Sequence, residues 1–96
     1  MKAGFISSAE LELKEAVDYY ETARPGLGGE FLDEVEATIH LIEAHPLAWH
    51  PMSARTRRCR LHRFPFGLIY QVRENDILIV SVMDLRRDPK RWEQFL

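Results

Sequence analysis

The sequence lacks pairs of cysteines, long hydrophobic segments and internal repeats. Its 96 residues include one cysteine, Cys59, so an internal disulfide is excluded and a reducing cytoplasm is expected. No apolar run approaches the ~20 residues that a membrane-spanning helix needs. The chain does not open on the basic and then apolar segments of a signal peptide, and it has no repeat or low-complexity segment. We therefore expect one small cytoplasmic domain over residues 1–96.

The chain also lacks the spacing of a metal site. Its four histidines are His40, His45, His50 and His62, and none stands at metal-ligand spacing from Cys59 or a carboxylate. The sequence therefore predicts no metal and no other cofactor. Cys59 lies in an alternating apolar pattern, which favours a small core residue over a nucleophile.

Basic residues are scarce in the first half of the chain, and acidic residues are scarce in the second. Residues 1–48 hold three basic and ten acidic residues, a balance of −7. Residues 49–96 hold ten basic and five acidic residues, a balance of +5, which gives the net charge of −2. A basic half predicts an anionic partner, either a nucleic acid or an acidic stretch of another protein.

The N-terminal half predicts a short edge strand and two helices. Residues 3–6 are long enough for an edge strand only. Ser7, with Glu10 three residues later, has the capping-box pattern, so we expect a helix over about residues 8–24. A second helix is expected over about residues 29–46, and the short proline–glycine joint predicts an antiparallel hairpin. The charged residues of the first helix, expected on its solvent face, are Glu12, Lys14, Glu15, Asp18 and Glu21.

The C-terminal half predicts three strands and a short last helix. Residues 47–56 have the composition of a loop, residues 57–64 alternate, and residues 66–73 and 76–83 are strand-like. Asp88-Pro89 is a typical helix start. The expected fold is α+β in the order β-α-α-β-β-β. The helical hairpin should pack on one face of a mostly antiparallel sheet, followed by a short C-terminal helix.

The arginines of this half are the candidate binding residues. If Glu74-Asn75 is a two-residue turn, counting back along both strands places Arg63 opposite Arg86. Like charges directly opposed are destabilising, so such a pair is either solvated or bridged by a phosphate or carboxylate. A longer turn would remove this alignment. The candidate target-binding or anion-binding residues are Arg58, Arg60, Arg63, Arg86 and Arg87.

Three local motifs span nearly the whole chain in order. They are Tyr19-Tyr20-Glu21 with Pro25-Gly26-Leu27-Gly28, Phe31 and Glu34-Val35; Arg63-Phe64-Pro65-Phe66 with Ile69-Tyr70; and Val82 with Arg86-Arg87-Asp88-Pro89 and Trp92. On these motifs the chain resembles the RelE/ParE family of type II toxin–antitoxin toxins, and it is closest to the ParE-like branch. The resemblance implies a toxin that is neutralised by a cognate antitoxin, with operator DNA met only through that antitoxin.

The two branches of the family imply different activities. RelE-type toxins cleave messenger RNA on the ribosome, whereas the ParE branch is associated with DNA gyrase, which requires binding and no chemistry by the toxin. RNA cleavage needs a positioned base and acid. The nuclease branch commonly has an arginine where Gly67 stands, and a closing-motif histidine where Asp84 stands. Near the C-terminus it has a tyrosine or histidine, where this chain offers only Trp92 and Phe95.

These departures favour a binding toxin that inhibits growth through a target such as DNA gyrase. A ribosome-dependent endoribonuclease of RelE type is the alternative, and a copy that has lost toxicity but still binds antitoxin is a third possibility. If the chain is a nuclease, His62 is the candidate base, since it shares the phase of Arg58 and Arg60; otherwise it is an exposed strand histidine. Trp49 and Trp92 are candidate partner contacts, with burial as the competing interpretation.

Overall fold

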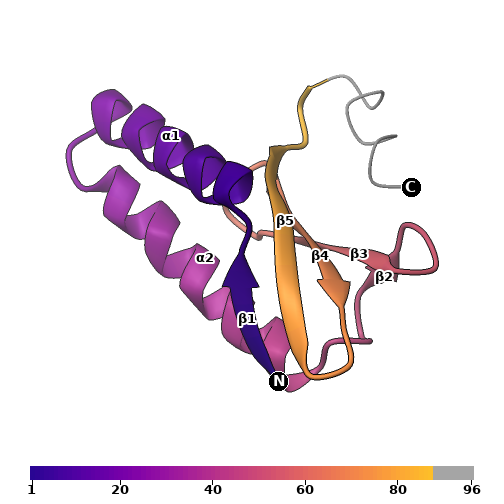
Figure 1. The fold of residues 1–96 in the computed structure, drawn as a ribbon. Coiled ribbons are helices and arrows are strands. Elements are labelled where there is room, and N and C mark those ends of the chain that lie inside the picture. The colour runs from indigo at the N-terminus through magenta and orange to yellow at the C-terminus, as the bar shows by residue number, and fades with distance from the viewer. Residues whose placement is uncertain (88–96) are drawn as a thin grey trace.

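The computed structural model of the chain describes residues 1–87, and its elements follow the predicted order (Figure 1). The elements are β1 (Lys2–Phe5), α1 (Ser7–Ala23), α2 (Leu27–Ala44), β2 (His50–Pro51), β3 (Thr56–Arg60), β4 (Phe66–Val72) and β5 (Asp76–Asp84). The two-residue strand β2 lies within the segment that was expected to be loop. The last helix expected from Asp88-Pro89, with Trp92, lies outside the described residues.

The five strands form one sheet in the order β1-β5-β4-β3-β2. Only β1 pairs in parallel, with β5, and the other neighbours are antiparallel. Figure 1 shows α1 and α2 as a hairpin beside the sheet. The α+β class and the packing of a helical hairpin on a mostly antiparallel sheet are therefore confirmed. Neither helix in residues 1–87 is long and apolar enough to cross a membrane.

The first helix begins directly after β1, with Ile6 and not a serine at its N-cap. The Ile6 amide donates to the Ile79 carbonyl at 3.1 Å, and the Ile6 carbonyl accepts from the amides of Ala9 and Glu10, each at 3.1 Å. Ser7 is already the first helical residue, and no side chain caps the helix. The expected capping box is wrong because β1 leads directly into α1.

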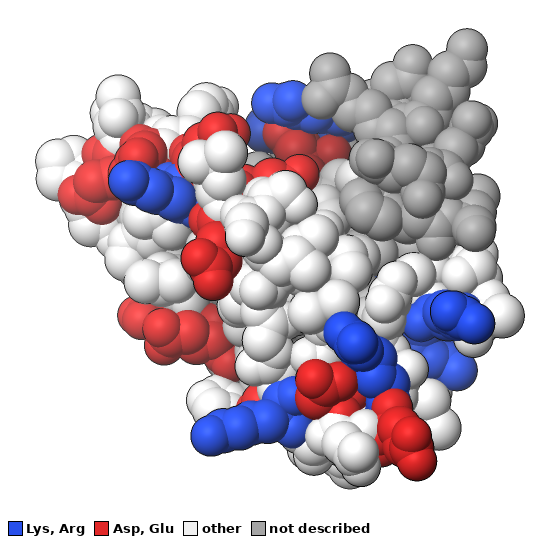
Figure 2. All heavy atoms as spheres, in the orientation of Figure 1, with Lys and Arg blue, Asp and Glu red and all other residues white. Residues whose placement is uncertain are grey.

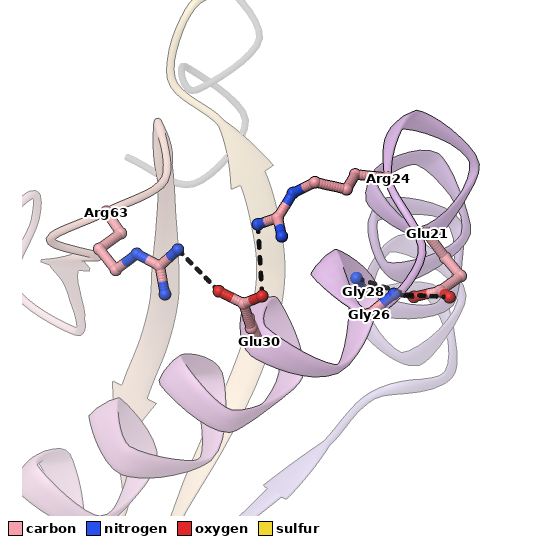
Figure 3. A network of polar contacts seen from close by, with 6 residues as sticks. All are labelled: Glu21, Arg24, Gly26, Gly28, Glu30 and Arg63. Atoms are coloured by element: carbon pink, nitrogen blue, oxygen red, sulfur yellow. Dashed lines mark hydrogen bonds and ion pairs between the residues drawn. The ribbon is translucent and has the colours of Figure 1, made fainter.

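The second helix begins at Leu27, two residues earlier than expected. Gly26 adopts the left-handed conformation, with φ at 90°, which reverses the chain after α1. The Glu21 carboxylate then accepts from the Gly26 amide at 2.9 Å and from the Gly28 amide at 3.0 Å (Figure 3). The last turn of α1 therefore satisfies the unpaired amides at the start of α2.

The core lies between the helices and the sheet. Four aromatic rings meet there, from Tyr20, Phe31, Phe64 and Phe66, with centroids 4.8 to 6.0 Å apart. Cys59 is buried in the same cluster, which confirms its expected role as a core residue. A second buried apolar cluster, of Ile69, Val80 and Met83, comes from β4 and β5.

A β-bulge in β5 changes the register of the central hairpin. Tyr70 pairs with Ile79, but the next pair is Ile69 with Ser81, so Val80 is an extra residue in β5. Beyond the bulge, the pairing of β4 with β5 is shifted by one residue from the pairing that counting back from the turn predicts.

The predicted opposition of Arg63 and Arg86 is therefore wrong. The Glu74-Asn75 turn does have two residues, because Val72 pairs with Ile77 and the Arg73 amide donates across the turn at 2.9 Å. The bulge shifts the pairs beyond it, however, and Arg63 lies in the connection between β3 and β4, outside both strands.

Candidate functional site

The five candidate arginines occupy three separate places. Arg58 pairs with Ile69 and Arg60 with Gly67, so both lie on the sheet face of the second apolar cluster. Arg63 lies in the β3–β4 connection, and Arg86 and Arg87 follow the end of β5. The five arginines therefore do not form one continuous surface.

Charge is unevenly distributed over the surface. Figure 2 shows acidic side chains predominating over the helical hairpin, while the sheet side of that view carries most of the basic ones. This matches the balance of −7 in residues 1–48 and of +5 in residues 49–96. An acidic partner segment would therefore meet attractive charge mainly on the sheet side.

Arg63 is held by an ion-pair network that links two turns of the fold. Its Nη2 atom donates to Glu30 Oε1 at 2.9 Å, while Arg24 Nη2 donates to Glu30 Oε2 at 3.3 Å (Figure 3). The hydrogen bond from Arg63, followed by the charge of Arg24, lowers the pKa of Glu30. The Arg63 guanidinium also lies 5.2 Å from the Phe64 ring centroid. Arg63 thus connects the β3–β4 turn to the start of α2.

His62 is fixed through its backbone and not through its ring. Its amide donates to Glu34 Oε2 at 2.8 Å, and the Arg63 amide donates to the same oxygen at 3.1 Å. The side chain is exposed, and no carboxylate in residues 1–87 forms an ion pair with it. The alternation that placed His62 on a strand ends before it, since β3 stops at Arg60.

The position that carries an arginine in the nuclease branch is enclosed here. A Cβ atom at Gly67 would lie 3.3 Å from Arg58 Cγ and 3.4 Å from Leu85 Cδ1. Gly67 is itself buried in β4. A side chain at this position would therefore be in contact with Arg58 and Leu85 from its first atom.

Two buried groups that could act as nucleophiles or acids are held in their neutral forms. Burial raises the pKa of the Cys59 thiol to about 11. Burial likewise raises the pKa of Tyr70 to about 12, and its hydroxyl donates to the Pro46 carbonyl at 2.7 Å. Trp49 is half-buried against the core, and its carbonyl accepts from Arg57 Nη1 at 2.8 Å.

A groove of about 620 Å³ lies between α1 and the end of β5. Its described lining residues are Glu12, Glu15, Ala16, Tyr19, Phe66, Val82, Met83, Asp84, Arg86 and Arg87. The helix supplies one wall and the strand the other. Two of the five candidate arginines therefore border a concave surface, which none of the sequence patterns indicated.

Asp84 forms ion pairs with both arginines of this groove. Arg86 donates from Nε to Oδ1 at 3.0 Å and from Nη2 to Oδ2 at 2.9 Å, and Arg87 Nε lies 3.9 Å from Oδ2. The hydrogen bonds from Arg86 lower the pKa of Asp84. Asp84 therefore pairs with both arginines. A carboxylate engaged in this way is an orienting group and a poor proton acceptor.

The expected place of Glu12 on the solvent face of the first helix is wrong, because this residue joins the helix to the sheet. Its Oε1 atom accepts from Ser81 Oγ at 2.9 Å and from the Val82 amide at 3.0 Å. Since β1 pairs with β5 only as far as Ile79, β5 has no strand neighbour on its β1 side here, and the carboxylate takes that place. The signal was available: Glu12 follows Ala9 by three residues and precedes Ala16 by four, which is the spacing of the buried stripe.

The adjacent tyrosines differ in burial, with Tyr20 in the core and Tyr19 at the rim, where it is 58% exposed. The Tyr20 hydroxyl is buried, and within the described part of the chain it has no hydrogen-bond partner. Burial raises the pKa of Tyr20, while the charge of Arg86 lowers it and that of Asp84 raises it.

Comparison with known proteins places this geometry in a family. A family model described as the ParE toxin of the type II toxin–antitoxin system parDE matches residues 5–89. A solved chain from the chromosomal ParDE system of P. aeruginosa superposes with a TM-score of 0.77 at 18% identity. The match covers 88% of this chain and 96% of that one, and at this identity it concerns the fold. No curated protein matches the chain.

Proposed function

The chain belongs to the ParE toxin family of type II toxin–antitoxin systems, and we propose that it inhibits growth in the cytoplasm by binding a target such as DNA gyrase. We further propose that a cognate antitoxin neutralises it. In this proposal the groove between α1 and β5, with Arg86 and Arg87 at its rim, is the contact surface for the target. The other candidate arginines lie elsewhere on the sheet or inside the Glu30 network.

One observation carries the proposal: Asp84, which lines the groove together with Arg86 and Arg87, forms ion pairs with both of them. The hydrogen bonds from Arg86 lower the pKa of Asp84 and make it a poor proton acceptor, and neither Cys59 nor Tyr70 is among the described lining residues of the groove. General acid–base catalysis contributes ~10²–10⁴-fold to a rate and needs groups within hydrogen-bond reach of the reacting atoms. The arrangement supports binding without chemistry.

The RelE-type nuclease remains the alternative because Arg58 and Arg60 lie together on the sheet face away from the aromatic core. A basic sheet face is suited to a phosphate backbone. The enclosed position of Gly67 and the exposed ring of His62, which forms no ion pair within residues 1–87, count against cleavage there.

Inducible expression in cells tests the proposal. We expect growth arrest, relief of that arrest when the product of the adjacent reading frame is co-expressed, and no discrete cuts when messenger RNA is mapped by primer extension. Cuts within translated codons that disappear in His62→Ala would instead establish the nuclease. Harmless expression combined with the absence of any complex would contradict the toxin assignment itself.

A further inference from the structure

One edge of the sheet is formed by β1 and then by the last part of β5. β1 stands first in the strand order and, among the described residues, pairs only with β5 (Figure 1). An edge strand presents backbone N–H and C=O groups to any strand that could be added, and proteins usually protect such edges. This edge is therefore a surface on which a further strand would pair unless a group of the protein covers it.

Alternate residues of β1 direct their backbone groups toward β5 and away from it. The Ile6 amide, which follows the strand, donates to the Ile79 carbonyl at 3.1 Å, so Ile6 and Gly4 face β5. Ala3 and Phe5 therefore present their amides and carbonyls at the free edge. Gly4 is exposed between them, and a Cβ atom there would meet nothing within 4 Å. The middle of the strand is accordingly unobstructed.

Glu43, near the end of α2, occupies the free edge at Ala3. Its Oε2 atom accepts from the Ala3 amide at 2.8 Å, a contact between residues 40 positions apart in the chain. Its Oε1 atom lies 3.5 Å from Nδ1 of His40, one turn earlier on the same helix, and the Glu43 side chain is only 23% exposed. The carboxylate is thus held where the carbonyl of an added strand would lie.

Glu12 covers the same edge beyond β1, where the edge belongs to β5. Its Oε1 atom accepts from the Val82 amide at 3.0 Å. Each helix of the hairpin therefore supplies one carboxylate to an edge amide. A carboxylate suits this role because it accepts hydrogen bonds but has no donor for the carbonyls of an approaching strand. Its charge would also have to lose solvent if a strand were added there.

We propose that Glu43 closes the β1 edge against a second copy of this chain, and that removal of its carboxylate lets two copies pair through antiparallel β1 strands. A second copy fits because the edge is self-complementary: Ala3 of one copy lies opposite Phe5 of the other, and Gly4 lies opposite Gly4. Both outward-facing residues then exchange backbone hydrogen bonds across the interface, and no like charges are opposed among them. Pairing of identical edges gives a closed dimer.

Self-association of the purified full chain, measured by sedimentation velocity over a range of concentrations, tests the proposal. We expect Glu43→Ala to dimerise at concentrations at least about tenfold lower than the wild type, since each copy gains a partner for an edge amide. Glu43→Gln keeps an acceptor oxygen and should behave as the wild type. Glu36→Ala, which removes an exposed carboxylate of the same helix, is the matched control. Equal self-association of Glu43→Ala and Glu36→Ala would overturn the proposal.

A proline at the edge distinguishes strand pairing from loss of structure. Ala3→Pro removes the outward amide and leaves the bond from Ile6 to β5 in place, and proline is tolerated on edge strands. Added to Glu43→Ala, it should raise the concentration needed for dimerisation at least about tenfold. Dimers that persist in the double variant, or aggregates that form as the thermal unfolding transition of Glu43→Ala disappears, would contradict pairing through β1.

Amide NMR spectra of Glu43→Ala locate the contact. The resonances of Ala3, Gly4 and Phe5 should shift as the protein concentration rises, while those of β3, near the other edge of the sheet, should not. Shifts confined to other parts of the surface would show that the copies meet elsewhere and would refute the assignment. Neither target nor antitoxin is present in these samples, so this outcome is independent of the proposed function.

Discussion

Two adjacent glycines at the start of α2 should respond in opposite directions to the same substitution. A Cβ atom at Gly28 would lie 2.7 Å from the Val17 carbonyl oxygen and 2.9 Å from Glu21 Cβ, so the two helices would have to separate. Gly29 is exposed, and a Cβ atom there meets nothing within 4 Å. The hairpin therefore requires glycine at the first position and not at the second.

The magnitudes follow from the two effects that compete. Alanine is favoured over glycine in a helix by ~0.5–1 kcal/mol, which should stabilise Gly29→Ala by about that amount. Overpacking costs ~1–3 kcal/mol and exceeds this gain at Gly28, where one contact is a backbone carbonyl that cannot rotate away. We expect Gly28→Ala to lose about 1–2 kcal/mol, which lowers the melting temperature by roughly 4–15 °C.

Thermal and urea unfolding of both variants beside the wild type would measure this difference. Gly29→Ala controls for helix propensity, since it makes the same chemical change one residue away. If Gly28→Ala proved as stable as Gly29→Ala, the close approach of α1 and α2 at this glycine would be refuted.

Three further predictions concern other residues. Glu12→Ala should lower the free energy of unfolding by about 1–3 kcal/mol in a urea titration, because two hydrogen-bond donors of β5 lose their acceptor. The control Glu36→Ala, at an exposed position, should change that free energy by no more than about 0.5 kcal/mol. The unfolded thiol and phenol lose protons near pH 9 and 10, whereas folded Cys59 and Tyr70 keep theirs to about 11 and 12. The free energy of unfolding should therefore fall as pH rises from 9 to 12, by an amount on the order of 2 kcal/mol for each group. In Tyr70→Phe the urea concentration at the midpoint of unfolding should depend less on pH over this range. His62→Ala should leave growth inhibition unchanged. If cells that express this variant grew freely although the protein folds normally, the ring of His62 would be shown to act on the target.

Periodicity and turn chemistry predicted most of the fold. The apolar stripes of both helices, the two-residue Glu74-Asn75 turn and the alternation through Cys59 are local patterns, and each matches the structure. The extra residue Val80 in β5 was not predictable, because a bulge depends on how two strands and a helix pack together and leaves no turn signal of its own.

The arrangement of the candidate site could not be predicted. The sequence offered Arg86 and Arg87 as candidate binding residues, which the structure places at the groove between α1 and β5. It could not show that Arg63 is held by Glu30, 33 residues away, or that α1 and β5 enclose a groove. Long-range pairing of charged residues is decided by topology, and single-sequence patterns carry no information on which partner is chosen.

The central claim, that this ParE-family chain acts by binding and not by cleaving RNA, is tested most directly with purified components. The chain would be added to DNA gyrase in a supercoiling assay and, separately, to translating ribosomes with an end-labelled messenger RNA. We expect the chain to inhibit supercoiling while the messenger RNA stays intact. The antitoxin should reverse this inhibition, and Arg86→Ala should inhibit less strongly than the wild type. Normal supercoiling together with discrete, ribosome-dependent cuts in the messenger RNA would contradict it.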